Sequence, residues 1–259
     1  MTRLNAEISD DLFQSVNPSG ASSVVLVCEH AVHFIPDEFD NLGLPEHLRK
    51  SHAAWDPGAM AVGVHLSNIL DATLIAGAVS RLVYDCNRPP SAVDAMPSRS
   101  ETIDIPGNLN LSQSTRNARA KRYYDPFCRA LSDRVAQANA PVIVTVHSFT
   151  PIYHGAQRDV EIGVLHDSDT RLADAMVQVV SDHTETDVQR NQPYGPEHGV
   201  THTLKEHAIP NGHLNVMLEI RNDLIETEGQ QLKMAEMIAA WLADAFVQTK
   251  AEGTVRCVV

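Results

Sequence analysis

The sequence predicts a three-layer α/β fold, in which a largely parallel sheet lies between two layers of helices. Short segments that are almost continuously apolar alternate with longer amphipathic segments. A continuous apolar run is typical of a strand buried on both faces, as in a parallel sheet covered by helices. The 259 residues contain no Gly/Ser-rich or Pro-rich linker and no internal repeat. We therefore expect a single domain spanning residues 1–259.

The predicted strands and helices alternate along the chain. The strands, rich in Val, Ile and Leu, are residues 23–29, 72–79, 81–86, 141–147, 160–166 and 213–221. The helices are residues 57–70, 116–139, 169–183 and 228–248. The first helix is preceded by Asp56-Pro57, a favourable pair for a helix start, and the last by the capping box of Thr227 and Gln230.

One long segment, residues 89–117, fits neither element type. It contains four prolines and little periodicity. A connection of this length is uncommon inside a compact domain unless it has a function. The segment is predicted to be a lid or binding loop, with a variable surface loop as the alternative.

Composition restricts the class of partner. The formal net charge of −13 argues against nucleic acid and against anionic membranes. An anionic substrate would need a local cationic pocket to overcome this charge. The N-terminal segment lacks an apolar signal region, no run is long enough to span a bilayer, and the four cysteines form no C-x-x-C pair. We expect a cytoplasmic protein with reduced cysteines, as a monomer or small homo-oligomer.

Several common catalytic signatures are absent from the sequence. There is no G-x-G-x-x-G, G-x-x-x-x-G-K-[ST], G-x-S-x-G or H-E-x-x-H motif. Nucleotide binding, a serine-hydrolase nucleophile elbow and a helical zinc-protease motif are therefore unsupported.

Two predicted strands each run into a histidine. VVLVCEH ends on His30, and PVIVTVH ends on His147. In parallel sheets ligands bind at the carboxyl ends of the strands, so both imidazoles would meet at the binding edge. A catalytic zinc site commonly uses two histidines and a carboxylate. The third ligand could be Asp56, Glu29 or, with a third imidazole, His33.

Charged residues occur on two other apolar segments. In NVMLEIRND, Glu219 interrupts a strand and Arg221 points to the same face. A buried carboxylate is costly unless it is paired or functional, so Glu219 is either in an ion pair with Arg221 or a general base. In SRLVYDCNRP, Arg81 and Arg88 flank a predicted strand. Arginine suits bidentate capture of a carboxylate, and we expect one of the two to bind substrate and the other to be structural.

A rival histidine cluster lies near the C-terminal third of the chain. Its members are His198, His202, His207 and His213. His198 and His202 have helical spacing, but Gly199 and a flanking proline make a helix there doubtful. This run ranks below the two strand-end histidines as a metal site. One of its histidines, with His202 as the candidate, could contact the substrate.

The motifs together resemble those of the N-formylglutamate amidohydrolase family. CEHA with the following Pro36, then HAAWDPGA, SRLVYDCNRP, VHSFTP and MLEIRNDL, appear in the family's order over about residues 24–225. The family is similar to the zinc-carboxypeptidase-like hydrolases, with a phosphorylase/hydrolase-like fold. The resemblance implies three layers with a central mixed, mostly parallel sheet.

The resemblance also implies roles for individual residues. It implies a site for zinc, or another divalent cation, on His30, Asp56 and His147, although these peptidases carry a glutamate where this chain has His33. It implies Glu219 as general base, Asn87 and Arg88 as ligands of the substrate carboxylate, and Arg81 as a further candidate for that carboxylate. In the reaction, Arg81 or a histidine of the 198–213 run could instead stabilise the oxyanion. Arg221 and His202 are additional substrate-binding candidates.

The implied reaction is hydrolysis of N-formyl-L-glutamate to formate and L-glutamate, an activity of amino-acid catabolism. Two alternatives stay open from the sequence. The same chemistry could act on another N-acyl amino acid or a small amide, with residues 89–117 shaping the pocket. The scaffold could instead bind small acids without catalysis.

Overall fold

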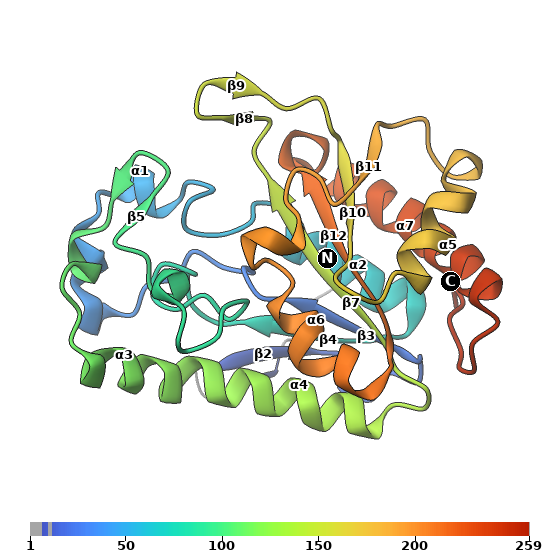
Figure 1. Ribbon diagram of the computed structural model, residues 1–259, viewed down its shortest axis with the longest axis horizontal. Helices are drawn as coiled ribbons and strands as arrows, with labels where there is room; N and C mark the ends of the chain where they lie inside the picture. The colour runs from blue at the N-terminus through green and yellow to red at the C-terminus, as the bar shows by residue number, and fades with distance from the viewer. Residues whose placement is uncertain (1–6, 10–11, 259) are drawn as a thin grey trace.

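The computed structural model describes residues 7–9 and 12–258, and it contains a mixed sheet between helices (Figure 1). The strands of the main sheet are β1 (Glu7–Ser9), β2 (Phe13–Val16), β3 (Val24–Cys28), β4 (Thr73–Gly77), β7 (Val142–Phe149), β10 (Ile162–Leu165), β11 (Val188–Arg190) and β12 (Leu214–Arg221). Their order is β1-β2-β4-β3-β7-β12-β10-β11. The central strands β4, β3, β7 and β12 run parallel, whereas β2 and β10 are antiparallel to their inner neighbours. The prediction of a mixed, mostly parallel sheet is confirmed.

Helices cover both faces of this sheet. One face carries α2 (Ala59–Leu70), α5 (Arg171–Val179) and α7 (Glu228–Thr249), and the other carries α4 (Asp125–Gln137) and α6 (His202–His207) (Figure 1). Alternate side chains of β3 enter the two cores. Val24 and Leu26 pack with α2 and α7, and Val25 and Val27 pack with α4. Both faces of β3 are therefore buried, which explains its continuous apolar run.

The remaining elements are short. They are α1 (Glu46–Arg49), α3 (Gln113–Arg119) and the hairpins β5–β6 (Arg99–Ser100 and Ile103–Asp104) and β8–β9 (Ile152–Tyr153 and Ala156–Gln157). A single π turn, residues 120–124, joins α3 to α4, so the helix predicted over 116–139 is divided. Among the described helices, none combines the length and apolarity needed to cross a membrane.

The segment 81–86 is not a strand, contrary to the prediction. It forms a succession of turns. The hydroxyl of Ser80 donates to the carbonyl of Ala54 and accepts from the amide of Leu82, which bends the chain at the start of the segment. The apolar side chains of the segment are buried in the core on the α4 side. Residues 81–86 are therefore apolar because they form a buried loop, and not because they pair as a strand.

The start of α2 also differs from the prediction. The helix begins at Ala59 after Gly58, and the side chain of Asp56 does not cap it. That carboxylate turns instead toward His30 and His147. The capping box at α7 is confirmed, because the side chains of Thr227 and Gln230 each accept a hydrogen bond from the other residue's amide.

Strands β1, β2 and β11 and helix α6 were not predicted from the sequence. Each is a short element, and the three strands lie toward the edges of the sheet. The described side chains of β2 and β11 are half-buried or exposed, with no clear period-two pattern of burial. Short, partly exposed strands give little hydrophobic signal, because only strands with a buried face need a strict pattern.

The end of β4 is packed so closely that only glycine fits. A Cβ atom at Gly77 would lie 2.2 Å from the carbonyl oxygen of Glu29, at the end of β3. We expect Gly77→Ala to lower the free energy of unfolding by about 1–3 kcal/mol, as overpacking does elsewhere. Urea unfolding followed by circular dichroism measures this.

The matched control is Gly229→Ala in the first turn of α7, where a Cβ would meet no atom within 4 Å. This variant should leave stability unchanged or raise it by up to about 1 kcal/mol. Equal stability of the two variants would contradict the close packing of β3 on β4.

Candidate active site

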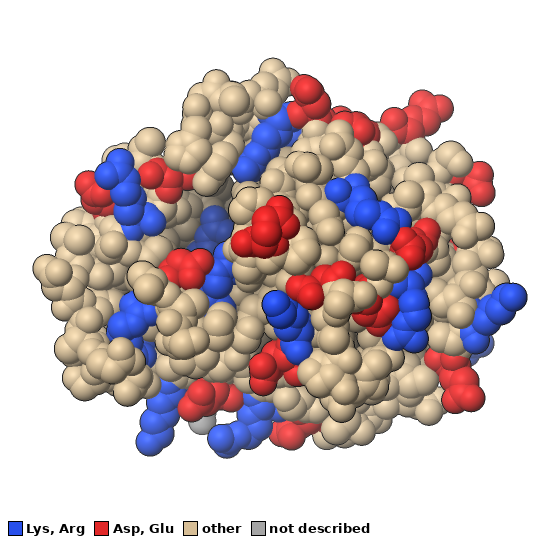
Figure 2. Space-filling view, in the orientation of Figure 1, with Lys and Arg blue, Asp and Glu red and all other residues tan. Residues whose placement is uncertain are grey.

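A cavity of about 370 Å³ opens at the edge where the parallel strands end. Its floor carries side chains from three neighbouring strands: His30 just after β3, His147 on β7 and Glu219 on β12. The space-filling view shows a hollow in this face with Lys and Arg atoms inside it and Asp and Glu atoms around it (Figure 2). The predicted meeting of the two histidines at one sheet edge is confirmed. Their rings lie 4.8 Å apart, edge to face.

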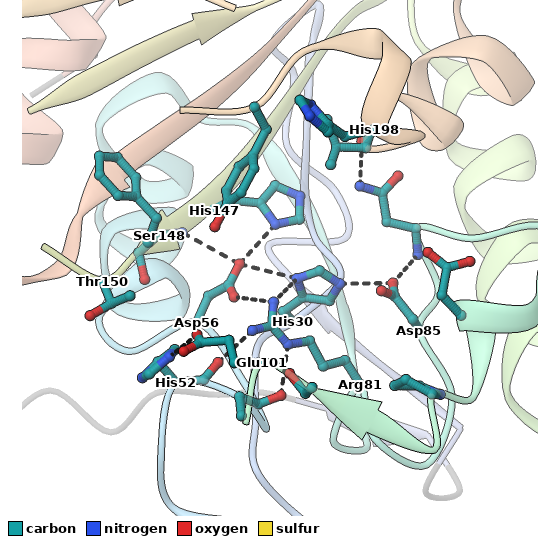
Figure 3. A pocket seen from close by; sticks show the side chains of 18 of the residues that line it. His30, His52, Asp56, Arg81, Asp85, Glu101, His147, Ser148, Thr150 and His198 are labelled. Atoms are coloured by element: carbon teal, nitrogen blue, oxygen red, sulfur yellow. Dashed lines mark hydrogen bonds and ion pairs between the residues drawn. The ribbon is translucent and has the colours of Figure 1, made fainter. Parts of the chain in front are cut away.

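Asp56 lies between the two histidines (Figure 3). Its Oδ2 atom is 3.2 Å from Nδ1 of His30 and 2.8 Å from Nδ1 of His147. All three residues are buried, and one ligand atom from each lies within 4.8 Å of the others. Two imidazole nitrogens and one carboxylate oxygen form a donor set typical of catalytic zinc sites. The three residues can therefore hold a divalent cation.

The other two candidates for the third ligand lie elsewhere. Glu29 is on the far side of the His147 ring, with Oε2 3.1 Å from Nε2, and its Oε1 accepts from the hydroxyl of Thr203. His33 packs edge to face on Trp55, with ring centroids 5.1 Å apart. Among the described residues, Asp56 alone of the three candidates belongs to the cluster.

Each histidine of the cluster is supported by a second buried carboxylate. Nε2 of His30 lies 2.8 Å from Asp85, as Nε2 of His147 lies near Glu29. Such carboxylate–histidine pairs fix the ring orientation of metal ligands and raise their basicity. Here they leave both Nδ1 atoms facing Asp56. This role of Asp85 was not predicted from the sequence.

The charges at the cluster also favour a cation. Burial alone would lower the pKa of His30, but the charges of Asp85 and Asp56 outweigh it and raise that pKa. The pKa of His147 is raised in the same way, against burial, by Glu29 and Asp56. A site that stabilises protonated imidazoles stabilises a bound divalent cation by the same electrostatics.

The supporting role of Asp85 gives a first prediction for the site. We expect Asp85→Asn to weaken zinc binding by about 10- to 100-fold, as loss of an outer carboxylate does at other metal sites. Competition against a chromophoric chelator measures the affinity. Asp94→Asn is the matched control, because Asp94 lines the same cavity but pairs with Arg88. Equal affinities of the two variants would contradict the role of Asp85.

Glu219 is the fourth buried ionisable group at the floor. It pairs with His147 in the register of β12 on β7, and its Oε2 has no hydrogen-bond partner among the described residues. Burial raises the pKa of Glu219 to about 7, the charge of Asp56 adds to this, and the nearby cations oppose it. A buried carboxyl with an unpartnered oxygen and a pKa near neutrality has the properties of a general base.

Arg81 is held against the cluster. Its Nη1 donates to Oδ1 of Asp56 at 3.1 Å, its Nε donates to the carbonyl of Ala53, and its Nη2 donates to the carbonyl of His52. About a quarter of the side chain is exposed, toward the cavity. The guanidinium is thus fixed in orientation beside the two histidines.

Arg88 and Asn87 also line the cavity, and their side chains bind mostly to other parts of the protein. Arg88 pairs with Asp94 at 2.7 Å and donates to the carbonyl of Gly199. The Asn87 amide donates to the carbonyl of Val200, and its oxygen accepts from the amide of Thr203 at 3.0 Å. This pair therefore ties the loop after residue 80 to the start of α6.

Arg221 and His202 do not reach the cavity. Arg221 pairs with Glu161 and Asp223 at 3.2 and 2.8 Å, so the alternative of a Glu219–Arg221 ion pair is wrong. Position 221 is the last residue of β12, where its long side chain can turn to the loop beside it. His202 lies against Tyr124 of the π turn, whose hydroxyl is 2.7 Å from Nε2.

The rival histidine run does not form a metal cluster among the described residues. Of its members, His198 alone lines the cavity, and His207 faces Ser132 on α4. The chain turns at Gly199 and α6 begins only at His202, so no helix joins His198 to His202.

Several lining residues had no signal in the sequence. Tyr153 lies on the two-residue strand β8 and Tyr194 on an irregular segment, so neither has a periodic pattern around it, and both line the cavity. Glu101, from the segment 89–117, lies 2.6 Å from His52 and joins that segment to the cavity wall. The closure of this segment as a lid stays a prediction.

The sequence matches one family of known proteins. The sequence profile of the N-formylglutamate amidohydrolase family matches residues 22–226, a range that contains every candidate ligand and Glu219. The chain belongs to the N-formylglutamate amidohydrolase family. As a member of this family it is a hydrolase that acts on amide bonds.

Two solved structures resemble this N-formylglutamate amidohydrolase family member. The gene product Atu2144 from Agrobacterium tumefaciens is 48% identical, with a TM-score of 0.91 over 96% of this chain and 100% of that chain. N-formylglutamate amidohydrolase from Ralstonia eutropha JMP134 shares the fold at 21% identity, with a TM-score of 0.60 over 92% and 96% of the two chains. No curated protein matches the sequence.

Proposed function

We propose that this protein is a metal-dependent amidohydrolase that cleaves N-formyl-L-glutamate into formate and L-glutamate. Membership of the family supports the reaction class and the substrate. The observation that carries the metal dependence is the buried cluster of His30, Asp56 and His147, with the unpartnered carboxyl of Glu219 beside it.

The donor set favours zinc, although two histidines and a carboxylate also suit cobalt and other divalent ions. The ion would be held by Nδ1 of His30, Nδ1 of His147 and the carboxylate of Asp56. When bound, it supplies a Lewis acid for the amide carbonyl and makes a water molecule acidic at neutral pH.

Residues of the protein transfer the proton of the attacking water and stabilise the negative charge on the carbonyl oxygen. Glu219 accepts the proton of the attacking water and delivers it to the nitrogen of the leaving amine. Arg81, fixed by two backbone carbonyls and Asp56, stabilises negative charge that develops on the carbonyl oxygen. A donor that is already oriented is effective because little reorganisation is needed during the reaction.

We assign the α-carboxylate of the substrate to Arg88, which would exchange its exposed partner Asp94 for the substrate. Asn87 would act indirectly, by holding the loop of Arg88 on the start of α6. Arg221 and His202, which bind other parts of the protein, are given no part in substrate binding.

We also infer that the enzyme works in the cytoplasm on a small anionic substrate. The described cysteines are all free, which suits a reducing compartment. The net charge of −13 makes the arginines of the cavity the local attraction for an anion.

The test is formate release from N-formyl-L-glutamate by protein stripped with a chelator and then reloaded with zinc. Activity should disappear on stripping and return on reloading. N-acetyl-L-glutamate, assayed in parallel, separates a deformylase from a broader amidohydrolase. Full activity of protein with less than about one metal ion per ten chains would contradict the metal dependence.

A further inference from the structure

A second cavity, of about 620 Å³, adjoins the first. The two share Tyr153, Tyr194 and His198 as lining residues. The second cavity continues past them to Arg158, close to the β8–β9 hairpin that projects from the sheet edge (Figure 1). A substrate at the cluster of His30, Asp56 and His147 can therefore extend past Tyr194 toward Arg158.

Arg158 is fixed in an aromatic cage. Its guanidinium carbon lies 4.3 Å from the ring centroid of Tyr153, 4.9 Å from that of Tyr194 and 5.4 Å from that of Phe149. Its Nη1 donates to the carbonyl of Thr150, and its Nη2 donates to the hydroxyl of Tyr194 at 2.9 Å. Cation–π contacts from several rings hold the guanidinium in one orientation without neutralising its charge.

Arg158 differs from the other arginines of the two cavities in its lack of a carboxylate partner. Arg81 pairs with Asp56, Arg88 with Asp94, and Arg99 with Asp104. No carboxylate among the described residues forms an ion pair with Arg158. In a chain of net charge −13, a half-buried arginine that keeps its full charge at a cavity wall is a site for an anionic ligand.

Tyr194 adds a hydrogen-bond donor at the same place. Its hydroxyl accepts from Arg158, so its own proton can point to a ligand, and no described residue accepts that proton. Burial raises the pKa of Tyr194 to about 12, and the charge of Glu219 adds to this although Arg158 opposes it. The hydroxyl thus stays protonated at neutral pH.

We propose that Arg158 and Tyr194 bind the distal carboxylate of the substrate, and that this pair selects N-acyl derivatives of acidic amino acids over neutral ones. This inference rests on the proposed function, in which Arg88 takes the α-carboxylate. The planar guanidinium binds a carboxylate through two parallel hydrogen bonds, and the hydroxyl supplies a third.

The test compares N-formyl-L-glutamate with N-formyl-L-glutamine, which has the same shape but an uncharged side chain. Arg158→Gln should raise KM for the glutamate substrate on the order of 10- to 100-fold, as loss of a charged hydrogen-bond partner does. KM for the glutamine substrate should change less than about 3-fold, because its amide carries no charge to pair with Arg158 and its NH2 group cannot accept a hydrogen bond. Tyr194→Phe should have a smaller effect in the same direction.

Arg99→Gln is the matched control, because Arg99 also lines the first cavity but pairs with Asp104. This variant should keep the wild-type preference for glutamate over glutamine. Calorimetry with glutarate, a dicarboxylate that cannot be hydrolysed, measures carboxylate binding independently of catalysis. Its affinity should fall at least about 10-fold in Arg158→Gln and stay near wild type in Arg99→Gln.

Equal losses on both substrates in Arg158→Gln, or an unchanged preference with unchanged glutarate affinity, would overturn the inference. A different result would contradict the proposed function itself. If the wild type released formate from neither substrate, that function would be wrong, and the glutarate affinities of the same variants would still decide whether Arg158 binds a carboxylate.

Discussion

Replacing Glu219 with glutamine should lower kcat by about 10²- to 10⁴-fold, the range for loss of a general base. Glutamine keeps the shape of the side chain but cannot accept a proton from water. Since Glu219 contributes no ligand atom to the cluster of His30, Asp56 and His147, the bound metal content should stay at the wild-type value. Steady-state formate release and metal analysis of the same preparation measure the two effects.

The pH profile separates a general base from a structural residue. Burial raises the pKa of Glu219 to about 7, and a bound cation nearby would pull it down. As the base works only when ionised, kcat/KM of the wild type should rise with pH through an acidic limb at or below about pH 7. In Glu219→Gln this limb should be absent from the residual activity.

The carboxyl of Glu219 also affects the free energy of unfolding. Activity should rise with pH as this group ionises, whereas the stability of the metal-free protein should fall. Burial raises the pKa of Glu219 in the folded protein above its ordinary value of 4.5, so its protonated form stabilises the metal-free fold at low pH. That contribution is present below pH 4.5 and is lost as pH rises toward about 7. Glu219→Gln should therefore reduce the pH dependence of unfolding of the metal-free protein in this window.

Two results would contradict the assignment of Glu219. Near wild-type kcat in Glu219→Gln would exclude it as the base. Tight binding of glutarate without turnover in either protein would instead favour the alternative of a small-acid binding protein on this scaffold. Glu161→Gln is a matched control, because Glu161 pairs with Arg221 outside the cavity.

Replacing Asp56 with asparagine should abolish activity and weaken zinc binding by more than about 100-fold, beyond the effect of an outer carboxylate. Burial would raise the pKa of Asp56, but the charges of His30 and Arg81 lower it, so the group is ionised at neutral pH. Asparagine removes the negative charge that lies between the two Nδ1 atoms. Chelator competition gives the affinity, and formate release gives the activity.

Asp223→Asn is the control for this variant. Asp223 also pairs with an arginine, Arg221, but outside the cavity. Circular dichroism should show that Asp56→Asn is folded before its affinity is compared. Wild-type zinc affinity in a folded Asp56→Asn protein would mean that the cluster of His30, Asp56 and His147 is not the metal site.

The central part of the fold could be read from local sequence. Strands β3, β7 and β12 are buried on both faces, so their apolar runs were continuous and unambiguous. Because parallel strands end at one edge of a sheet, the same pattern predicted that His30 and His147 would meet. Glu219 was recognisable since a carboxylate inside such a run must be paired or functional.

The pairing partners could not be read in this way. Asp85 faces His30 and not an arginine. The side chain of Asn87 hydrogen-bonds to the backbone of Val200 and Thr203, more than a hundred residues away in the chain. Residues 81–86 had the composition of a strand, but a turn organised by Ser80 buries them without strand partners. The apolar composition of a segment predicts that it is buried. It does not predict its hydrogen-bond partners, because these depend on contacts between segments distant in the sequence.

The sequence by itself thus determined the parallel sheet, its binding edge, the two histidines and the buried glutamate, because each depends on periodicity within one segment. The family resemblance already implied Asp56 as the third ligand. Tertiary structure alone decided the position of its carboxylate between the two histidines, the carboxylates behind the histidines, and the position of Arg158 beside Tyr194. These residues lie after strands or on irregular loops, where no periodicity specifies the direction of a side chain. Their arrangement is fixed only when the packed sheet brings those loops together.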